Sequence, residues 1–393
     1  MKQCLLFICV LLSACSRVDN FFLGEDNTDP PTKLTEIHEK VTVESQWKVK
    51  TGYGKHNEYV TLQPAIANDR IITADIQGNV IAVDRTTGKN IWRALLEQGV
   101  SSGPVLRNQV VVLGTRKGKV IALSSMNGKA LWTAEVSNEV LARPVLVGNK
   151  ALIQTTDGKL YAFNLADGKL LWRYEHNNPS MILRSGGSPV VTQDKVIAGF
   201  ADGRLVAVNL NNGELLWVRT VAQPEGGTDV QRMVDIAATP VVANGVLYVA
   251  SFQGQLAAIN LSSGNLIWHH KVSVYNDLAM DGNVIYASDS HSQLWAFNRV
   301  TGKVLWRQND LKGRNITAPV VNNDKLIIAD GSGYIHVLSK KNGQFLGRKK
   351  ITLLSGISAA PQVSQDHIYV LLNNGELEHL TLQAIPTQVI KKS

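Results

Sequence analysis

The stretch DGKLYAFNLADGKLLW, residues 157–172, predicts the fold of most of the chain. Its first Asp-Gly pair supplies the positive φ of a tight hairpin turn, and residues 159–163 then alternate as a strand does. A second Asp-Gly turn leads to a further strand that ends at Trp172. Two short apolar strands, 144–147 and 151–154, precede the stretch. Together these segments predict one four-stranded antiparallel sheet.

This unit recurs along the chain with a period near forty residues. Six copies share four positions: a turn residue, an alanine four positions after it, a glycine ten positions after it, and a tryptophan four positions after that glycine. The glycine–tryptophan pairs are Gly88/Trp92, Gly128/Trp132, Gly168/Trp172, Gly213/Trp217, Gly264/Trp268 and Gly302/Trp306. A single sheet cannot bury both of its faces, so such a repeat predicts sheets that stack radially in a propeller.

The two ends of the repeat predict how the ring closes. Gly333 with Gly343 marks a seventh unit, and Gly375 opens an eighth that has no tryptophan strand of its own. Residues 41–49 form a strand around Trp47 with no preceding three strands, so we expect them to complete the last blade and cover its free edge. The predicted fold is therefore all-β: an eight-bladed β-propeller of four-stranded antiparallel blades, closed by the N-terminal strand. It spans residues 41–385, with 386–393 as a C-terminal tail.

The N-terminus indicates export and lipidation. Residues 4–12 form an apolar run too short to span a bilayer, and the run ends in Leu12-Ser13-Ala14-Cys15, which looks like a lipobox. We therefore predict a lipoprotein signal peptide at 1–14 and lipidation of Cys15. An ordinary signal peptide with a chance cysteine is the alternative. Cleavage would leave no other cysteine, so the domain would be held by its core alone.

Residues 15–40 are predicted to be the lipidated cysteine and a flexible tether, because the proline-marked run 25–31 is polar and lacks apolar residues to pack. Ser16 follows the cysteine at a position where lipoproteins of the inner membrane usually carry Asp. By resemblance to such lipoproteins, we expect an outer-membrane protein that is held by its lipid anchor and faces the periplasm.

Composition argues against several classes of function. The net charge of +8 is scattered, and no basic stripe with interleaved aromatic residues indicates nucleic acid. The nine histidines are dispersed, and His269-His270 are adjacent rather than spaced for ligation from one face. Residues 186–189, Gly-Gly-Ser-Pro, do not form a Gly-x-Ser-x-Gly nucleophile elbow. The sequence thus predicts no catalytic residue, no cofactor and no metal site.

Loop lengths indicate a binding face. The connection from tryptophan to the next proline takes twelve residues after Trp92 and Trp132, seventeen after Trp172 and twenty-three after Trp217. Equivalent connections emerge on one face of a propeller, so the two long loops should be neighbours at a binding surface. Apolar residues beside arginine suit a protein interface; the alternative is that Met181 and Leu183 only pin their own loop. The candidate partner-binding residues are Met181, Leu183, Arg184, Arg232 and Asp235.

The repeat, over about residues 41–385, resembles the quinoprotein (PQQ-type) propeller repeat. In that family the tryptophans dock neighbouring blades against each other, which implies a structural role for the six tryptophans of the pairs above. Gly347 takes the seventh such position, and we predict a weaker blade contact there.

With its lipobox and its size, the chain further resembles the BamB family, lipoproteins of the outer-membrane β-barrel assembly machinery. Residues 181–184 are similar to the Leu-x-Leu-Arg segment with which that family engages the periplasmic POTRA domains of BamA. Leu183 and Arg184 match that segment, and Met181 is a conservative departure. Asp235 matches the first member of the family's Asp-x-Asp pair, whereas Ala237 replaces the second carboxylate.

The resemblance implies a non-catalytic scaffold that binds BamA and the other lipoproteins of the assembly complex, and that aids insertion of outer-membrane proteins. Unfolded outer-membrane proteins are a further partner class that it suggests. Two alternatives stay open at the level of sequence. One is a quinoprotein-type oxidoreductase, and the other is a lipoprotein that binds peptidoglycan or another envelope polymer.

Overall fold

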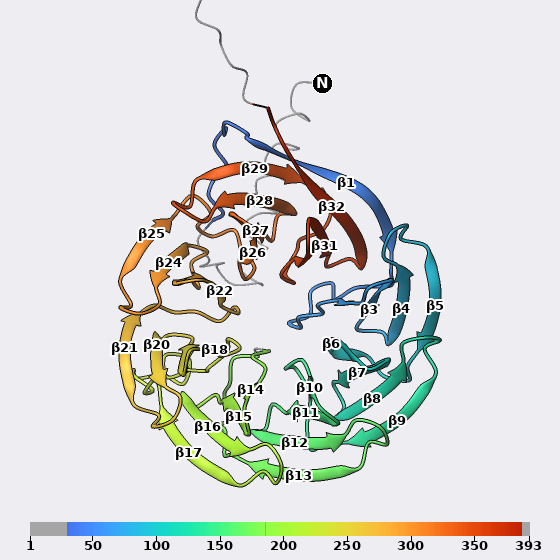
Figure 1. Cartoon of the computed structure of the whole chain (residues 1–393), viewed down its shortest axis with the longest axis vertical. Helices are drawn as coiled ribbons and strands as arrows, with labels where there is room; N and C mark the ends of the chain where they lie inside the picture. Colours follow the sequence, from blue (N-terminus) through green and yellow to red (C-terminus); the bar gives the residue numbers. More distant parts are fainter. Residues whose placement is uncertain (1–29, 185, 387–393) are drawn as a thin grey trace, which may run out of the picture.

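The computed structural model describes residues 30–184 and 186–386, and all regular structure within these ranges is β-strand. The strands form eight four-stranded antiparallel sheets arranged as a ring (Figure 1). This confirms the predicted eight-bladed propeller. The predicted signal peptide, Cys15 and residues 387–393 lie outside the described residues. No helix in the described part of the chain is long and apolar enough to cross a membrane.

Each blade takes four strands, which run from the centre of the ring outward. Blades 1 to 4 consist of β2 (Ala65–Ile66), β3 (Arg70–Ala74), β4 (Asn79–Asp84) and β5 (Asn90–Leu95); β6 (Val100–Arg107), β7 (Val110–Thr115), β8 (Lys119–Ser124) and β9 (Ala130–Glu135); β10 (Val145–Val147), β11 (Lys150–Gln154), β12 (Lys159–Asn164) and β13 (Leu170–Glu175); and β14 (Val190–Thr192), β15 (Lys195–Gly199), β16 (Arg204–Asn209) and β17 (Leu215–Thr220).

Blades 5 to 8 consist of β18 (Val241–Ala243), β19 (Val246–Ala250), β20 (Gln255–Asn260) and β21 (Leu266–Lys271); β22 (Ala279–Asp281), β23 (Val284–Ser288), β24 (Leu294–Asn298) and β25 (Val304–Gln308); β26 (Val320–Asn322), β27 (Lys325–Ala329), β28 (Tyr334–Ser339) and β29 (Phe345–Lys350); and β30 (Gln362–Ser364), β31 (His367–Leu371), β32 (Glu376–Ala384) and β1 (Val41–Lys50).

The repeated glycine and tryptophan interlock neighbouring blades. Gly168 has φ of +72°, and a Cβ at that position would lie 2.6 Å from the Trp132 ring of the preceding blade. The Trp132 indole N–H donates to the carbonyl of Leu165 at 2.9 Å, which satisfies its buried donor. Equivalent bonds confirm the predicted docking role of Trp92, Trp172, Trp268 and Trp306.

Trp217 also packs between neighbouring blades, as predicted, but it lacks the glycine contact and the indole hydrogen bond of the other tryptophans. Gly264, where its ring would be expected to pack, is instead covered by Arg219, whose Nη2 donates to the Ser263 carbonyl at 2.9 Å. The Trp217 ring packs against the core between blades 4 and 5, but its buried indole nitrogen has no partner in the described part of the chain. Arg219 follows two residues later on the same face of the strand and takes the inter-blade position.

The N-terminal strand closes the ring as predicted. β1 pairs along its length with β32, from Val41 opposite Ala384 to Lys50 opposite Glu376, and Figure 1 shows the two strands side by side at the top of the ring. A Cβ on Gly347 would lie 2.1 Å from the Val41 carbonyl oxygen, so the missing side chain leaves room for the first residue of β1. The predicted weakness of this junction stays a prediction.

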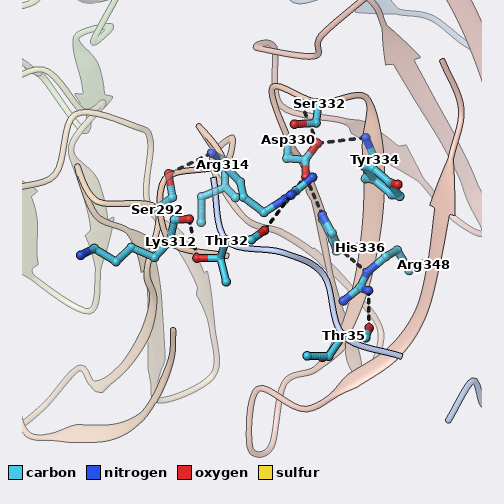
Figure 2. Close-up of polar contacts among 11 residues, drawn as sticks. Thr32, Thr35, Ser292, Lys312, Arg314, Asp330, Ser332, Tyr334, His336 and Arg348 are labelled. Atoms are coloured by element: carbon cyan, nitrogen blue, oxygen red, sulfur yellow. Dashed lines mark hydrogen bonds and ion pairs between the residues drawn. The ribbon is translucent and has the colours of Figure 1, made fainter. Parts of the chain in front are cut away.

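Residues 30–40, here called the strap, correct the expectation of a free tether. The Thr32 N–H donates to the Lys312 carbonyl at 3.0 Å, and the Lys40 N–H donates to the Leu346 carbonyl at 2.7 Å. Leu34 packs partly buried against the core shared by blades 6 and 7. Besides Leu34, the strap is held mainly through its backbone groups, as Figure 2 shows for Thr32 and Thr35.

Candidate functional site

Two long connections lie next to each other on one face of the ring. The first, 176–189, joins β13 to β14, and the second, 221–240, joins β17 to β18. The Leu183 N–H donates to Asp235 Oδ1 at 2.8 Å, and the Ser188 N–H donates to Thr239 Oγ1 at 3.0 Å. These bonds confirm the prediction that the two loops are neighbours.

Asp235 lies inside this pair of loops rather than at its surface. Its side chain is buried, and only Oδ1 has a hydrogen-bond partner in the described part of the chain. Burial raises the pKa of Asp235 to about 7, although the hydrogen bond from Leu183 acts in the opposite direction. Asp235 therefore positions the loop that carries Leu183. Ala237, which replaces the second carboxylate of the Asp-x-Asp pair, is also buried.

Arg184 lies at the edge of the same loop with nearly half of its side chain exposed. Its Nη2 contacts both carboxylate oxygens of Glu139, at 2.9 and 2.8 Å. Glu139 is buried and also lies 3.8 Å from Arg116, which in turn pairs with Glu58 at 2.5 Å. The hydrogen bond from Arg116 holds the pKa of Glu58 below its ordinary value. This chain of alternating charges fixes the guanidinium of Arg184 while leaving part of it open to a partner.

Sequence reasoning missed Glu139, Arg116 and Glu58. They come from connections and turns of other blades: Glu139 from the connection between β9 and β10, Arg116 from the turn between β7 and β8, and Glu58 from the connection between β1 and β2. One signal was available for Glu139, since it lies in the connection directly before the one that carries Arg184. Adjacent connections are neighbours in a propeller, so opposite charges on them are candidates for pairing.

The other predicted residues divide into exposed and half-buried positions. Met181 is exposed, whereas Ile182 and Leu183 are half-buried. Leu183 thus anchors its own loop in part, while Met181 remains available to a partner. Arg232 is exposed and pairs with Asp229 of its own loop at 2.5 Å. Arg232 is therefore at the surface of the second loop, in an ion pair within that loop.

A cavity of about 330 Å³ opens beside Leu183 and Arg184 at the centre of this face. Aromatic side chains from other blade connections, among them Tyr59, Phe252 and Tyr275, line its wall. The arrangement offers an apolar depression with a cation at its rim, which suits an apolar side chain from a protein partner. Among the described residues, no group of three or more His, Cys, Asp or Glu side chains could hold a metal ion.

Comparison with known proteins identifies the family. A family model described as outer membrane protein assembly factor BamB matches residues 76–308 and 296–385. The chain belongs to the BamB family. It is 40% identical to the BamB of Legionella pneumophila (strain Paris) over 378 residues, which cover 96% of this chain and 98% of that relative. The BamB of Escherichia coli (strain K12) is 31% identical over 381 residues, covering 94% of this chain and 96% of the relative.

Solved structures agree with this family at the level of the fold. The crystal structure of BamB from Moraxella catarrhalis matches with a TM-score of 0.79 and 27% identity, and the match covers 86% of this chain and 99% of that one. A quinohemoprotein alcohol dehydrogenase from Comamonas testosteroni matches with a TM-score of 0.71 at 12% identity, covering 86% and 76% of the two chains. The second likeness shows a common propeller fold.

Proposed function

We propose that this BamB-family chain is a non-catalytic scaffold lipoprotein of the outer-membrane β-barrel assembly complex. Lipidation of Cys15 would anchor it in the outer membrane, facing the periplasm. Its two long loops would bind the POTRA domains of BamA and so aid insertion of outer-membrane proteins. The other lipoproteins of the complex are further partners in this proposal. Membership of the BamB family, whose relatives are named as assembly factors, supports the role.

One observation supports the binding site above the others: the hydrogen bond from Leu183 to Asp235. It holds the first loop against the second, with Met181 exposed and Arg184 fixed by the buried Glu139. A loop that is ordered before binding pays less conformational entropy when it docks. Arginine in such a position is typical of residues that dominate interface energies. The loop therefore combines the residue types and the rigidity that a protein interface needs.

The test is a pull-down of the tagged lipoprotein from gently solubilised envelopes, read by mass spectrometry. The wild type should recover BamA and its companions. Arg184→Glu should weaken BamA binding by about 2 kcal/mol or more, roughly thirtyfold in affinity, because it reverses the charge at the interface and repels Glu139. Affinity for the purified periplasmic domain of BamA would give the same comparison quantitatively.

Arg173→Glu is the matched control. Arg173 is also a half-exposed arginine paired with a carboxylate, Glu175, at 2.9 Å, but it lies on the outer strand β13. Its reversal should leave BamA recovery unchanged. If the Arg184→Glu protein is folded and still recovers BamA, Arg184 is not part of the interface. Loss of BamA from the wild-type sample itself, with binding to isolated cell wall instead, would favour an envelope-polymer-binding lipoprotein.

A further inference from the structure

The strap enters the propeller on the face that carries the two long loops, at blades 6 and 7. Arg314, in the connection from β25 to β26, donates from Nη1 to the Thr32 carbonyl at 3.0 Å. Arg348, on β29, donates from Nη1 to the Thr35 carbonyl at 2.9 Å. Figure 2 shows the two guanidinium groups on either side of the cluster, each pointing at the strap. The N-terminal side of the chain is thereby fixed to this part of the ring.

A buried ion-pair network holds these two arginines in place. Asp330 Oδ2 accepts from Arg314 Nε at 2.7 Å and lies 3.0 Å from His336 Nε2, while Arg348 Nε donates to His336 Nδ1 at 3.2 Å. Burial lowers the pKa of His336, so its ring is neutral and its one proton faces Asp330. Burial alone would raise the pKa of Asp330, but the hydrogen bonds from His336 and Arg314 outweigh it and lower that pKa. The strap is docked on a rigid part of blade 7.

Two consecutive leucines project from the same blade. Leu353 and Leu354 lie in the connection from β29 to β30 and are 82% and 96% exposed. The loop that presents them is fixed at both ends to the turn of Asp330: the Ile351 N–H donates to the Gly333 carbonyl at 3.0 Å, and the Ile357 N–H donates to the Asp330 carbonyl at 3.2 Å. Adjacent, highly exposed large apolar side chains on an ordered loop indicate a surface that something covers.

The sequence next to the leucines is basic, while Glu376 on the neighbouring strand β32 is paired with Lys48 at 3.2 Å. Lys349 and Lys350 directly precede the loop, and residues 349–356 contain no acidic side chain. Lys50, at the end of the neighbouring strand β1, hydrogen-bonds to the Asn374 carbonyl and is exposed. Leucines framed by lysines match a surface that is apolar inside and anionic at its boundary, which is the chemistry of a lipid headgroup layer.

We propose that the loop of Leu353 and Leu354 contacts the lipid surface to which the N-terminus is anchored. This inference rests on the proposed lipidation of Cys15. Fourteen residues lie between Cys15 and Pro30, so the anchor lies within about 50 Å of the point where the strap begins. The strap is bonded to Arg314, which pairs with Asp330, and the leucine loop is bonded to the backbone of the Asp330 turn. In this proposal the anchor therefore brings this edge of the ring to the membrane.

The proposed membrane edge leaves the partner-binding loops free. The connection from β29 to β30 is four blades away from the connection from β13 to β14, on the opposite side of the ring (Figure 1). A propeller that touches the bilayer with blades 7 and 8 therefore holds Met181 and Arg184 away from the lipid. Both contacts can form at once.

The test places a fluorescent probe on the leucine loop of the full lipidated chain. Leu354→Cys, labelled with the polarity-sensitive dye NBD, is reconstituted in vesicles of phosphatidylethanolamine and phosphatidylglycerol that contain nitroxide-labelled lipid. The matched control is Val300→Cys: Val300 is apolar and 62% exposed, but it lies in the turn between β24 and β25, on the opposite face of the ring. Both changes are on exposed side chains and leave the core intact.

The expected result is a blue-shifted emission at position 354 and about threefold or more stronger quenching by the nitroxide lipid than at position 300, because an interfacial side chain enters the headgroup boundary. Equal, weak quenching at both positions in protein that floats with the vesicles would overturn the membrane contact alone. Failure to float would overturn the lipid anchor and this inference together. A blue shift that appears only when the BamA periplasmic domain is added would overturn it in favour of a protein partner.

Discussion

The backbone N–H of Leu183 donates to Oδ1 of Asp235 across 2.8 Å, and this bond joins two long neighbouring connections of the propeller. Asp235 is 3% exposed, and its Oδ2 has no partner among the described residues. A buried carboxylate with one hydrogen bond is costly to keep charged. The position of the loop that presents Arg184 therefore depends on a group that the fold disfavours in its ionised form.

The first prediction is that Asp235→Asn removes a pH dependence of stability. The pKa of Asp235 rises from 3.8 to about 7 in the folded chain, so the folded state binds the proton more tightly than the unfolded state. Protonation of Asp235 therefore stabilises the folded state by on the order of 4 kcal/mol. This contribution is complete below about pH 4 and is lost as the pH rises to about 7. The asparagine variant stays neutral throughout, and its side-chain oxygen can still accept from Leu183.

Chemical denaturation of wild type and variant at pH 5 and pH 8 checks this prediction. Asp235→Asn should gain stability over the wild type at pH 8 and much less at pH 5. Asp235→Ala provides the contrast, because it removes the acceptor of Leu183 and should loosen the first loop at both pH values. A stability difference between wild type and Asp235→Asn that does not change with pH would contradict the raised pKa.

A second prediction concerns Glu139, which pairs with Arg184 and lies near Arg116. Glu139→Ala leaves both guanidinium groups without their shared buried carboxylate, so we expect a loss of about 2 kcal/mol in stability. The freed Arg184 is also less ordered, and affinity for the BamA periplasmic domain should fall about fivefold. Thermal unfolding and titration calorimetry give the two numbers. Glu175→Ala, which removes an exposed carboxylate paired with Arg173, should change neither by more than a few tenths of a kcal/mol.

A third prediction compares two tryptophans of the repeat. The Trp172 indole N–H donates to the Leu210 carbonyl at 2.9 Å, whereas the buried Trp217 indole nitrogen has no partner in the described ranges. Replacement by phenylalanine removes the N–H in both cases. Trp172→Phe should therefore cost about 1 kcal/mol more than Trp217→Phe in the free energy of unfolding. Equal losses in urea denaturation would show that the hydrogen bond of Trp172 does not distinguish the two blade junctions.

The number of blades and their closure were predictable because the repeat encodes contacts between units. Gly168 accommodates the ring of Trp132 from the preceding blade, so the same two residue types recur in most copies. The neighbouring long loops followed from counting residues between tryptophan and proline. These are periodic features, and periodicity is visible in a single sequence.

The remaining features depend on contacts that no period records. Asp235 looks like a surface residue in a polar loop, yet it is buried together with the flanking Val234 and Ile236. Arg219, and not Trp217, covers Gly264, although both side chains lie on the same face of one strand. The strap is held through the backbone carbonyls of Thr32 and Thr35, which every residue type carries.

The last prediction addresses the junction that lacks a tryptophan. The α-carbon of Gly347 lies so close to the first residue of β1 that a Cβ would come within 2.1 Å of the Val41 carbonyl oxygen. Because that atom belongs to the backbone, Gly347→Ala must displace the start of the closing strand, and we expect a loss of about 2 kcal/mol or more in stability. Hydrogen exchange should speed up first along β1 and β32, whose pairing closes the ring.

Gly227→Ala is the control, since a Cβ there meets nothing closer than 4.0 Å, and it should leave the exchange pattern unchanged. Uniform protection of all blades in Gly347→Ala would mean that closure does not depend on this contact.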